Sequence, residues 1–570
     1  MRRRSGQSLW RAILALGAVL VALNGGPVPP AGADSEKPDL GYSRAVAWHL
    51  DGMPEVAAME PTIREVLAHV HVGYQGVDGS KVDGFFPGTA YNYSHIPGVT
   101  PYYLYIRDTA TDLPMVRYYF DAPALRSAIE EFLRLQYYDG AISATIAPDF
   151  TVDKATTVSD EETSTVMAAL NAYDVLPDPA WLNQAIRGQS VIERLNAAMT
   201  WVLTQRRDAA TRLIKRAHTT DWGDVKWEPD TDPTHMLPGD QWTISIYDQA
   251  IAYAALRGLA RLNAAVGNDG DRARWEGEAI ELRAAANAML WMDQPGRGYY
   301  RVHVHVPPDR IRHQIDEAEI IAIGNAAAIY YGLAEPDKVA RILGALDRAR
   351  VAANAPKPGL ALSIAYPGWY QAQMAPRQYQ NGALWDWWAG RQISAEFWSG
   401  YWRLAREHLG QLARDWASHP GQVREWESPW LQRVSTDHAY GGAASVVGQA
   451  VVEGLFGVDI TGREVQLTPR LDEARGGVRV YQPSNDLYAA YEYQASERQV
   501  TIQYGSNSPT ALSVRLPVRW RQPSRAVLDD KDSLPVAYER VGEMTLARVT
   551  VPSGQHRVDL LRVPRGREKF

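Results

Sequence analysis

Apolar residues recur at spacings of three and four through most of residues 101–457, which is the period of helices with a buried face. One predicted helix ends near residue 119, and the next starts near residue 122. Further helices are predicted near residues 160–173, 190–205, 243–265, 271–290, 316–331, 336–350, 382–392, 395–418 and 440–455.

These helices are of two alternating kinds. Residues 320–331 are apolar on nearly every side, which a helix tolerates only when protein surrounds it. Residues 336–350 carry Val339, Ile342 and Leu346 on one face and charged residues on the others. Eleven or twelve helices that alternate in this way predict two concentric rings, an (α/α)6 barrel or six-hairpin toroid. An open solenoid of helix pairs would need a sequence repeat, and the sequence has none.

After Gly457 the apolar period changes to two, in short runs separated by Gly, Pro, Asn and Ser. Residues 458–565 therefore predict a small antiparallel β-sandwich domain behind the helical domain of residues 101–457. Residues 34–100 are expected to be a lead-in or a small N-terminal module.

The N-terminus has the pattern of an export signal. Three arginines precede an apolar segment at residues 12–23, and Ala31-Gly32-Ala33 fits a signal-peptidase site. We therefore expect residues 1–33 to be cleaved and the protein to be secreted, periplasmic or part of the cell envelope. No later apolar run approaches the ~20 residues of a membrane span, so no membrane contact is expected after cleavage.

The composition excludes some classes of function and favours carbohydrate as the ligand. The chain has no cysteine, which excludes disulfides and thiol chemistry. Its net charge is −7, and loss of the four arginines in residues 1–33 leaves −11, so nucleic acid is not an expected partner. Nineteen Trp and 29 Tyr against eight Phe favour carbohydrate, because these rings offer both an apolar face and a polar edge.

Residues 219–229 place acids beside tryptophans just before a periodic helical segment. The indole of Trp222 has the flat face that stacks on a sugar ring, and a carboxyl group desolvated beside it acquires the raised pKa of a general acid. We favour Asp224 as that acid, with Asp221 and Glu228 as alternatives. The competing interpretation is a surface loop whose acids cap the next helix.

A second loop with the same mixture is Arg424-Glu425-Trp426-Glu427-Ser428-Pro429-Trp430. Inverting glycoside hydrolysis needs a second carboxylate, placed to activate a water across the sugar ring. We favour Glu425 as this base, with Glu427 as the alternative and Trp426 as a substrate contact.

Two further segments are candidates for sugar binding. Asp108 either accepts hydrogen bonds from two sugar hydroxyls while Arg107 holds it, or favours the dipole of the helix that it opens. Residues 378–388 contain three Trp within four positions together with Asn381 and Asp386, more than packing alone requires. Trp385 and Asp386 are therefore predicted to contact substrate.

No metal or other cofactor is predicted. His303 and His305 alternate as on a strand, but no carboxylate or thiol is near them in the sequence to complete a zinc site.

At these residues the sequence resembles the six-hairpin glycosidases, the superfamily of glucoamylases, trehalases, glycogen-debranching enzymes and processing α-glucosidases. The resemblance extends from about Tyr102 to Leu471 and is carried by the order and spacing of its motifs. It implies that Arg107 and Asp108 bind the nonreducing sugar, that Asp224 is the acid and that Glu425 is the base. It further implies a sugar subsite lined by Tyr379, Asn381, Gly382 and Trp385.

The expected activity is inverting exo-hydrolysis of an α-linked glucoside or a related oligosaccharide, without a cofactor. Two alternatives stay open. The same barrel is compatible with a rhamnoside, mannoside or trehalose, and a catalytically silent carbohydrate-binding envelope protein would show the same aromatic composition.

Overall fold

The computed structural model describes residues 40–88, 103–228, 232–308, 311, 313–520 and 524–563. The predicted signal peptide and the start of the lead-in lie outside these residues, as do residues 89–100 of the lead-in. Among the helices of the described ranges, none combines the length and apolar character needed to cross a membrane.

Six helices of the described chain form a closed cycle of contacts, in which each packs against the next and the last packs against the first. They are largely buried, as the apolar pattern requires; in α12, residues 386–397 are all buried. In cyclic order they are α3 (Ile106–Val116), α5 (Glu161–Val175), α8 (Ile246–Ala265), α10 (Gly324–Tyr330), α12 (Asp386–Trp398) and α14 (Gly441–Gln449).

A second set of helices packs against this cycle; most of its members are about half-exposed, and one of them, Ala122–Arg134, is mostly buried. On α11 the buried face contains Val339, Ile342 and Leu346, as predicted. The set consists of α2 (Met59–Val70), α4 (Ala122–Arg134), α7 (Val191–Trp201), α9 (Asp269–Leu290), α11 (Pro336–Ala352) and α13 (Trp402–Ser418).

Two of the predicted helices begin later than expected, one after a strand and the other after a 3-10 helix (Glu317–Glu319) and an extended stretch. Thr243 and Ile244 lie in β10 (Trp242–Ser245), which pairs with β13 (His303–Val306), and α8 starts only after Ser245. Within residues 316–331, only Gly324–Tyr330 forms α10. Before it, Ala322 bridges to Leu362 in extended conformation.

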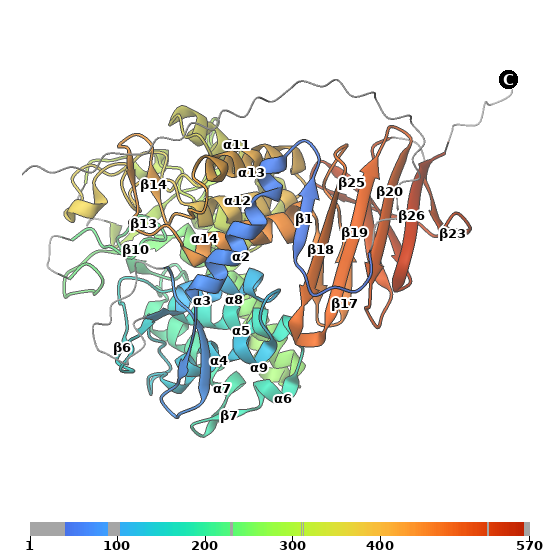
Figure 1. Ribbon diagram of the computed structural model, residues 1–570. Helices are drawn as coiled ribbons and strands as arrows, with labels where there is room; N and C mark the ends of the chain where they lie inside the picture. The colour runs from blue at the N-terminus through green and yellow to red at the C-terminus, as the bar shows by residue number, and fades with distance from the viewer. Residues whose placement is uncertain are drawn as a thin grey trace, which may run out of the picture. The chain divides into compact units, whose positions relative to one another are not determined.

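Two sheets form the β-domain, on the right in Figure 1. The smaller sheet starts at Val458, and the larger one has β1, coloured blue, at its edge. The five-stranded sheet has the order β16 (Val458–Thr461), β17 (Glu464–Leu467), β21 (Leu512–Pro517), β25 (Met544–Val551) and β24 (Ala537–Val541). The seven-stranded sheet has the order β1 (Ala47–Leu50), β18 (Gly476–Gln482), β19 (Leu487–Ala495), β20 (Gln499–Ser506), β26 (Gly554–Arg562), β22 (Ser524–Leu528) and β23 (Asp532–Leu534).

The pairing differs from a purely antiparallel C-terminal domain in two respects. β17 and β21 pair in parallel, and β1 comes from the lead-in, with Ala47 opposite Arg479 of β18. Because the lead-in also supplies α2, its described residues do not form a separate module. They complete the outer helices and one edge of the sheet.

Candidate active site

A cavity of about 270 Å³ brings together side chains from both predicted acid loops. Asp224 and Glu425 line it, although they are separated by two hundred residues of sequence. Its walls include the other predicted residues Arg107, Asp108, Trp222, Tyr379 and Trp385, and also Tyr105, Gln380, Trp387 and Tyr440.

The loop that carries Asp224 is held by its backbone. The amide N–H of Asp224 donates to Gln380 Oε1 over 3.1 Å, and its carbonyl accepts from Thr157 Oγ1 over 3.2 Å. The buried guanidinium of Arg216 donates to the carbonyl of Gly223. A Cβ on Gly223 would lie 2.8 Å from Gln380 Oε1, so the close approach of this loop requires glycine. Buried Oδ1 of Asp224 has no hydrogen-bond partner among the described residues.

Asp108 lies in the first turn of α3, where it is hydrogen-bonded to Tyr440 at the start of α14 over 2.8 Å. Burial raises the pKa of Asp108 to about 6, and the hydrogen bond from Tyr440 and the charge of Arg107 limit the rise.

Arg107 is held by Asp160, the residue that precedes α5. Nη2 of Arg107 lies 2.8 Å from Asp160 Oδ1, and the hydroxyl of Tyr247 donates to Asp160 Oδ2 over 2.7 Å. Asp160 is completely buried, so it can orient Arg107 but does not line the cavity.

The two acids of the second loop have different surroundings. Glu425 lines the cavity, and its amide N–H donates to Ser435 Oγ over 3.1 Å. Glu427 is outside the described lining and lies 2.9 Å from Lys357 Nζ and 2.7 Å from Arg424 Nη1. Burial disfavours its charge, but these two cations outweigh burial and lower the pKa of Glu427. Glu427 thus forms ion pairs outside the described lining, and Glu425 is the better placed of the two candidate bases.

Packed indoles form one wall. The ring of Trp222 lies 4.7 Å from that of Trp385 and 5.2 Å from that of Trp387, both edge to face. Tyr379 packs against Trp385 at 5.2 Å and has Trp426 behind it at 6.2 Å. Trp426 contacts Tyr379 and lies outside the described lining of the cavity, whereas the sequence predicted it as a substrate contact.

Asn381 and Asp386 were predicted to contact substrate, and the structure places both elsewhere. Asn381 is fully buried, accepts from Tyr366 N over 2.8 Å and donates to two backbone carbonyls, so its amide is used by the loop itself. Asp386 is buried 2.6 Å from Lys357 Nζ and accepts from Trp416 Nε1 over 2.9 Å. Both residues therefore stabilise the segment that forms the cavity wall, and neither belongs to the described lining.

Asp221, the alternative acid, caps two helices. Its Oδ1 accepts from Tyr247 N over 3.2 Å and its Oδ2 from Gly324 N over 2.9 Å, at the starts of α8 and α10. A Cβ on Gly324 would lie 2.2 Å from Asp221 Oδ2, so this cap requires glycine. Burial raises the pKa of Asp221 to about 7, as a general acid needs, but the carboxyl group is outside the described lining. Glu228 is likewise outside it and accepts from Gln241 N over 2.9 Å.

A carboxylate lies beside His303 and His305, which sequence proximity did not indicate. Glu317 lies 3.1 Å from His303 Nδ1 and 2.8 Å from His305 Nε2, although it is distant in sequence. His218 and His313 contact the same carboxylate. None of these residues belongs to the described lining of the cavity.

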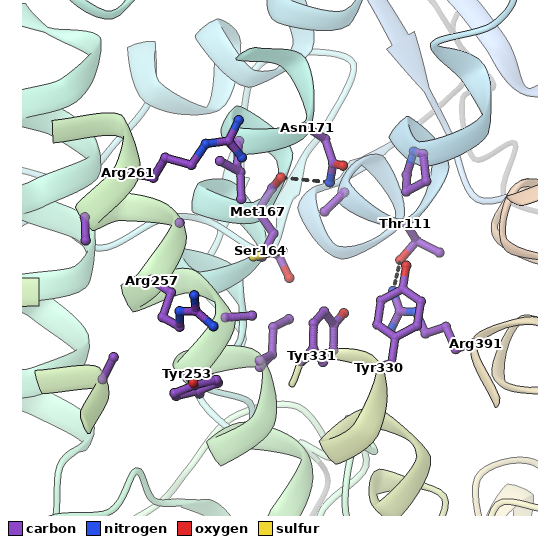
Figure 2. A pocket seen from close by; sticks show the side chains of 18 of the residues that line it. Thr111, Ser164, Met167, Asn171, Tyr253, Arg257, Arg261, Tyr330, Tyr331 and Arg391 are labelled. Atoms are coloured by element: carbon purple, nitrogen blue, oxygen red, sulfur yellow. Dashed lines mark hydrogen bonds between the residues drawn. The ribbon is translucent and has the colours of Figure 1, made fainter. Parts of the chain in front are cut away.

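A larger cavity of about 850 Å³ is lined by residues along the cyclic helices and α9, and Arg107 lines both cavities. Figure 2 shows arginines and tyrosines in its walls, among them Arg257, Arg391 and Tyr331. Its described lining contains one carboxylate, Glu276. Hydrolysis through two carboxyl groups has no pair to use there, so the smaller cavity is the better candidate active site.

No family model and no curated protein matches the sequence. A GH78 family rhamnosidase of Bacillus sp. GL1 matches with a TM-score of 0.59 at 13% identity, over 84% of this chain and 43% of that chain. The α-L-rhamnosidase of Streptomyces avermitilis, solved with L-rhamnose, matches with a TM-score of 0.58 at 14% identity, over 90% and 42% of the two chains. The GH63 mannosylglycerate hydrolase of Thermus thermophilus, solved with glucose, gives 0.50 at 13% identity, over 69% and 99%.

The chain has the fold of the six-hairpin glycosidases. This confirms the predicted resemblance at the level of the fold. The chain spans less than half the length of the two rhamnosidases and almost the whole length of the mannosylglycerate hydrolase.

Proposed function

We propose that this protein is an inverting glycoside hydrolase with Asp224 as general acid and Glu425 as general base. One observation carries the proposal: the two carboxyl groups line one cavity together with Arg107, Asp108 and the indole wall. In this proposal the closed cycle of helices is the inner ring of an (α/α)6 barrel, and the second set is the outer ring.

Each group has a task in the proposed reaction. Asp224 gives its proton to the oxygen of the departing group, while Glu425 removes a proton from the water that attacks the anomeric carbon from the opposite side. The carboxylate of Asp108 accepts hydrogen bonds from sugar hydroxyls, and Arg107 balances its charge. Trp222 and Trp387 supply apolar faces for the ring, and their indole N–H groups have no partner among the described residues.

The size of the cavity supports exo action. Sites for drug-sized ligands measure roughly 300–1,000 Å³, so a cavity of about 270 Å³ suits a single sugar ring. We propose an α-linked glucoside or a related oligosaccharide as substrate. An α-L-rhamnoside is the second candidate, favoured by the likeness in fold to the two rhamnosidases.

A panel of nitrophenyl glycosides tests the proposal, with α-glucoside, α-L-rhamnoside and α-mannoside compared alongside trehalose. Turnover of one member that disappears in Glu425→Gln supports it, provided that Asp224→Asn lowers turnover of the corresponding alkyl glycoside or disaccharide more than that of the nitrophenyl glycoside. Binding of sugars without turnover of any member would favour the carbohydrate-binding alternative and overturn the enzymatic one.

We further propose that the protein is exported. The basic and apolar N-terminus supports cleavage after Ala33 and a periplasmic, envelope or secreted location. N-terminal sequencing of protein from the native host tests this: Asp34 as the first residue supports cleavage, and an intact Met1 contradicts it.

A further inference from the structure

Three histidines and one glutamate converge next to the loop that carries Asp224. His218, His305, His313 and Glu317 each offer one ligand atom, and these atoms lie within 4.8 Å of one another. They come from three places in the chain: the end of β9 (Arg216–Ala217), the strand β13, and residues 313–319. Their side chains are buried, with 10% exposure at Glu317 and 3% or less at the histidines.

One oxygen of Glu317 has more polar neighbours than it can accept hydrogen bonds from. Oε1 of Glu317 has the hydroxyl of Tyr366 at 2.7 Å, His303 Nδ1 and His313 Nε2 at 3.1 Å, and His218 Nε2 at 3.4 Å. A carboxylate oxygen has about two lone pairs for such donors. The nitrogens His305 Nδ1 and His313 Nδ1 are meanwhile buried with no hydrogen-bond partner among the described residues.

His303 has a different role from the other three. Its Nε2 accepts from the amide of Asp221 over 3.2 Å, so in the neutral ring Nδ1 carries the hydrogen and donates to Glu317. His303 and Tyr366 therefore orient the carboxylate of Glu317 through hydrogen bonds. Partners of this kind commonly surround metal ligands.

We propose that His218, His305, His313 and Glu317 bind one zinc ion. Three neutral imidazoles and one carboxylate satisfy the tetrahedral coordination of Zn²⁺. Ligands at about 2.0–2.2 Å from the metal lie about 3.3–3.6 Å apart, so the present group needs only a small contraction. Calcium and magnesium prefer oxygen ligands, and copper(I) prefers sulfur.

The site is built to be structural. Four protein ligands leave no position for a water or a substrate, and aromatic rings surround the cluster. Trp227 stacks on His218 at 5.6 Å, and Trp369 and Tyr366 lie 6.0 and 5.8 Å from the same ring.

A bound zinc ion would restrain the loop that carries Asp224. Trp227 N donates to the carbonyl of His218 over 2.9 Å, which closes the loop between these residues, and Asp221 in its middle donates to His303. A zinc ion on His218 thus ties the loop to β13 and to Glu317.

Metal analysis of the purified full chain is the direct test. We expect about one zinc ion per chain after growth with zinc. After stripping with a chelator, the wild-type protein should take up one cobalt(II) ion with the intense visible absorption of tetrahedral coordination. Its melting temperature should fall on stripping and recover with zinc. A stripped protein that binds neither ion and melts unchanged would overturn the proposal.

Three variants assign the ligands. His305→Gln and Glu317→Gln should each lower zinc affinity at least about ten-fold, and Tyr366→Phe about ten-fold, because outer partners commonly contribute that much. His235→Gln is the matched control, since His235 lies 3.0 Å from Asp153 and 2.9 Å from Asp232 but outside the cluster. Equal zinc binding by the control and by both ligand variants would also overturn the proposal. This readout does not depend on hydrolysis, so its failure is distinct from failure of the proposed function.

Discussion

The hydroxyl of Tyr440 donates a hydrogen bond of 2.8 Å to Oδ1 of Asp108, joining residues that are 332 positions apart. It links the first turn of α3 to the start of α14, the two helices at which the cycle closes. The same contact therefore joins the two helices at which the cycle closes and orients the carboxylate in the cavity.

This contact predicts a pH effect. Burial raises the pKa of Asp108 to about 6, and the Tyr440 hydrogen bond opposes the rise by stabilising the ionised form. In Tyr440→Phe the pKa of Asp108 should rise further, because that stabilisation is lost. We expect the acidic limb of kcat/KM to move to higher pH than in the wild type. An unchanged limb in full pH profiles of both proteins would mean that Asp108 does not control it.

Replacement of Asp108 separates sugar binding from helix capping. In Asp108→Ala we expect kcat/KM to fall about 10²-fold or more, since two charge-assisted hydrogen bonds of about 1.5–3 kcal/mol each are lost. Circular dichroism and the melting temperature should stay close to wild type. Near-normal turnover with lowered stability would assign Asp108 to the helix terminus instead.

The acid and the base should respond differently to the leaving group. General acid catalysis contributes about 10²–10⁴-fold, but an activated aryl leaving group needs little protonation. Asp224→Asn should therefore impair an alkyl glycoside far more than a dinitrophenyl glycoside, whereas Glu425→Gln should impair both alike. Kinetics on the two substrates check this. Equal losses in both variants would argue against Asp224 as the acid.

Lys357 should be essential to stability. Its ammonium is buried within 2.6 Å of Asp386 and Asp415 and 2.9 Å from Glu427. Burial opposes the charge, but the three carboxylates outweigh it and raise the pKa of Lys357. Lys357→Met leaves these carboxylates uncompensated and should lower the free energy of unfolding by about 3–5 kcal/mol.

Urea unfolding measures this effect, with Lys81→Met as the control. Lys81 pairs with Asp83 but its side chain is 78% exposed, and an exposed pair contributes about 1 kcal/mol or less. Equal losses in the two variants would contradict a stabilising role for the buried network.

Local sequence pattern was sufficient to predict the main elements and to select two acidic residues that line one cavity. The period of three and four located the amphipathic α11, and the change to period two located the strands from Val458 onward. Clusters of acids with tryptophans identified Asp224 and Glu425, because the residue types needed for the chemistry are adjacent in the chain.

Pattern could not show which side chains of a cluster face the cavity. Asn381 and Asp386 are polar residues among tryptophans, yet backbone groups and Lys357 use them from behind. The cluster around Glu317 escaped prediction because its members, from His218 to Glu317, are brought together only by the pairing of β9, β10 and β13. Likewise, β1 carries no indication in its sequence that it joins a sheet formed by the other end of the chain.

The stereochemistry of hydrolysis tests the central claim most directly. If Asp224 is the acid and Glu425 activates a water across the ring, their carboxyl groups stand about 6.5 to 9.5 Å apart and the anomeric configuration inverts. Proton NMR of the first sugar released from an α-glycoside, recorded before mutarotation, should then show the β-anomer. Release of the α-anomer would contradict the account, because retention requires a nucleophilic carboxylate about 5 to 5.5 Å from the acid.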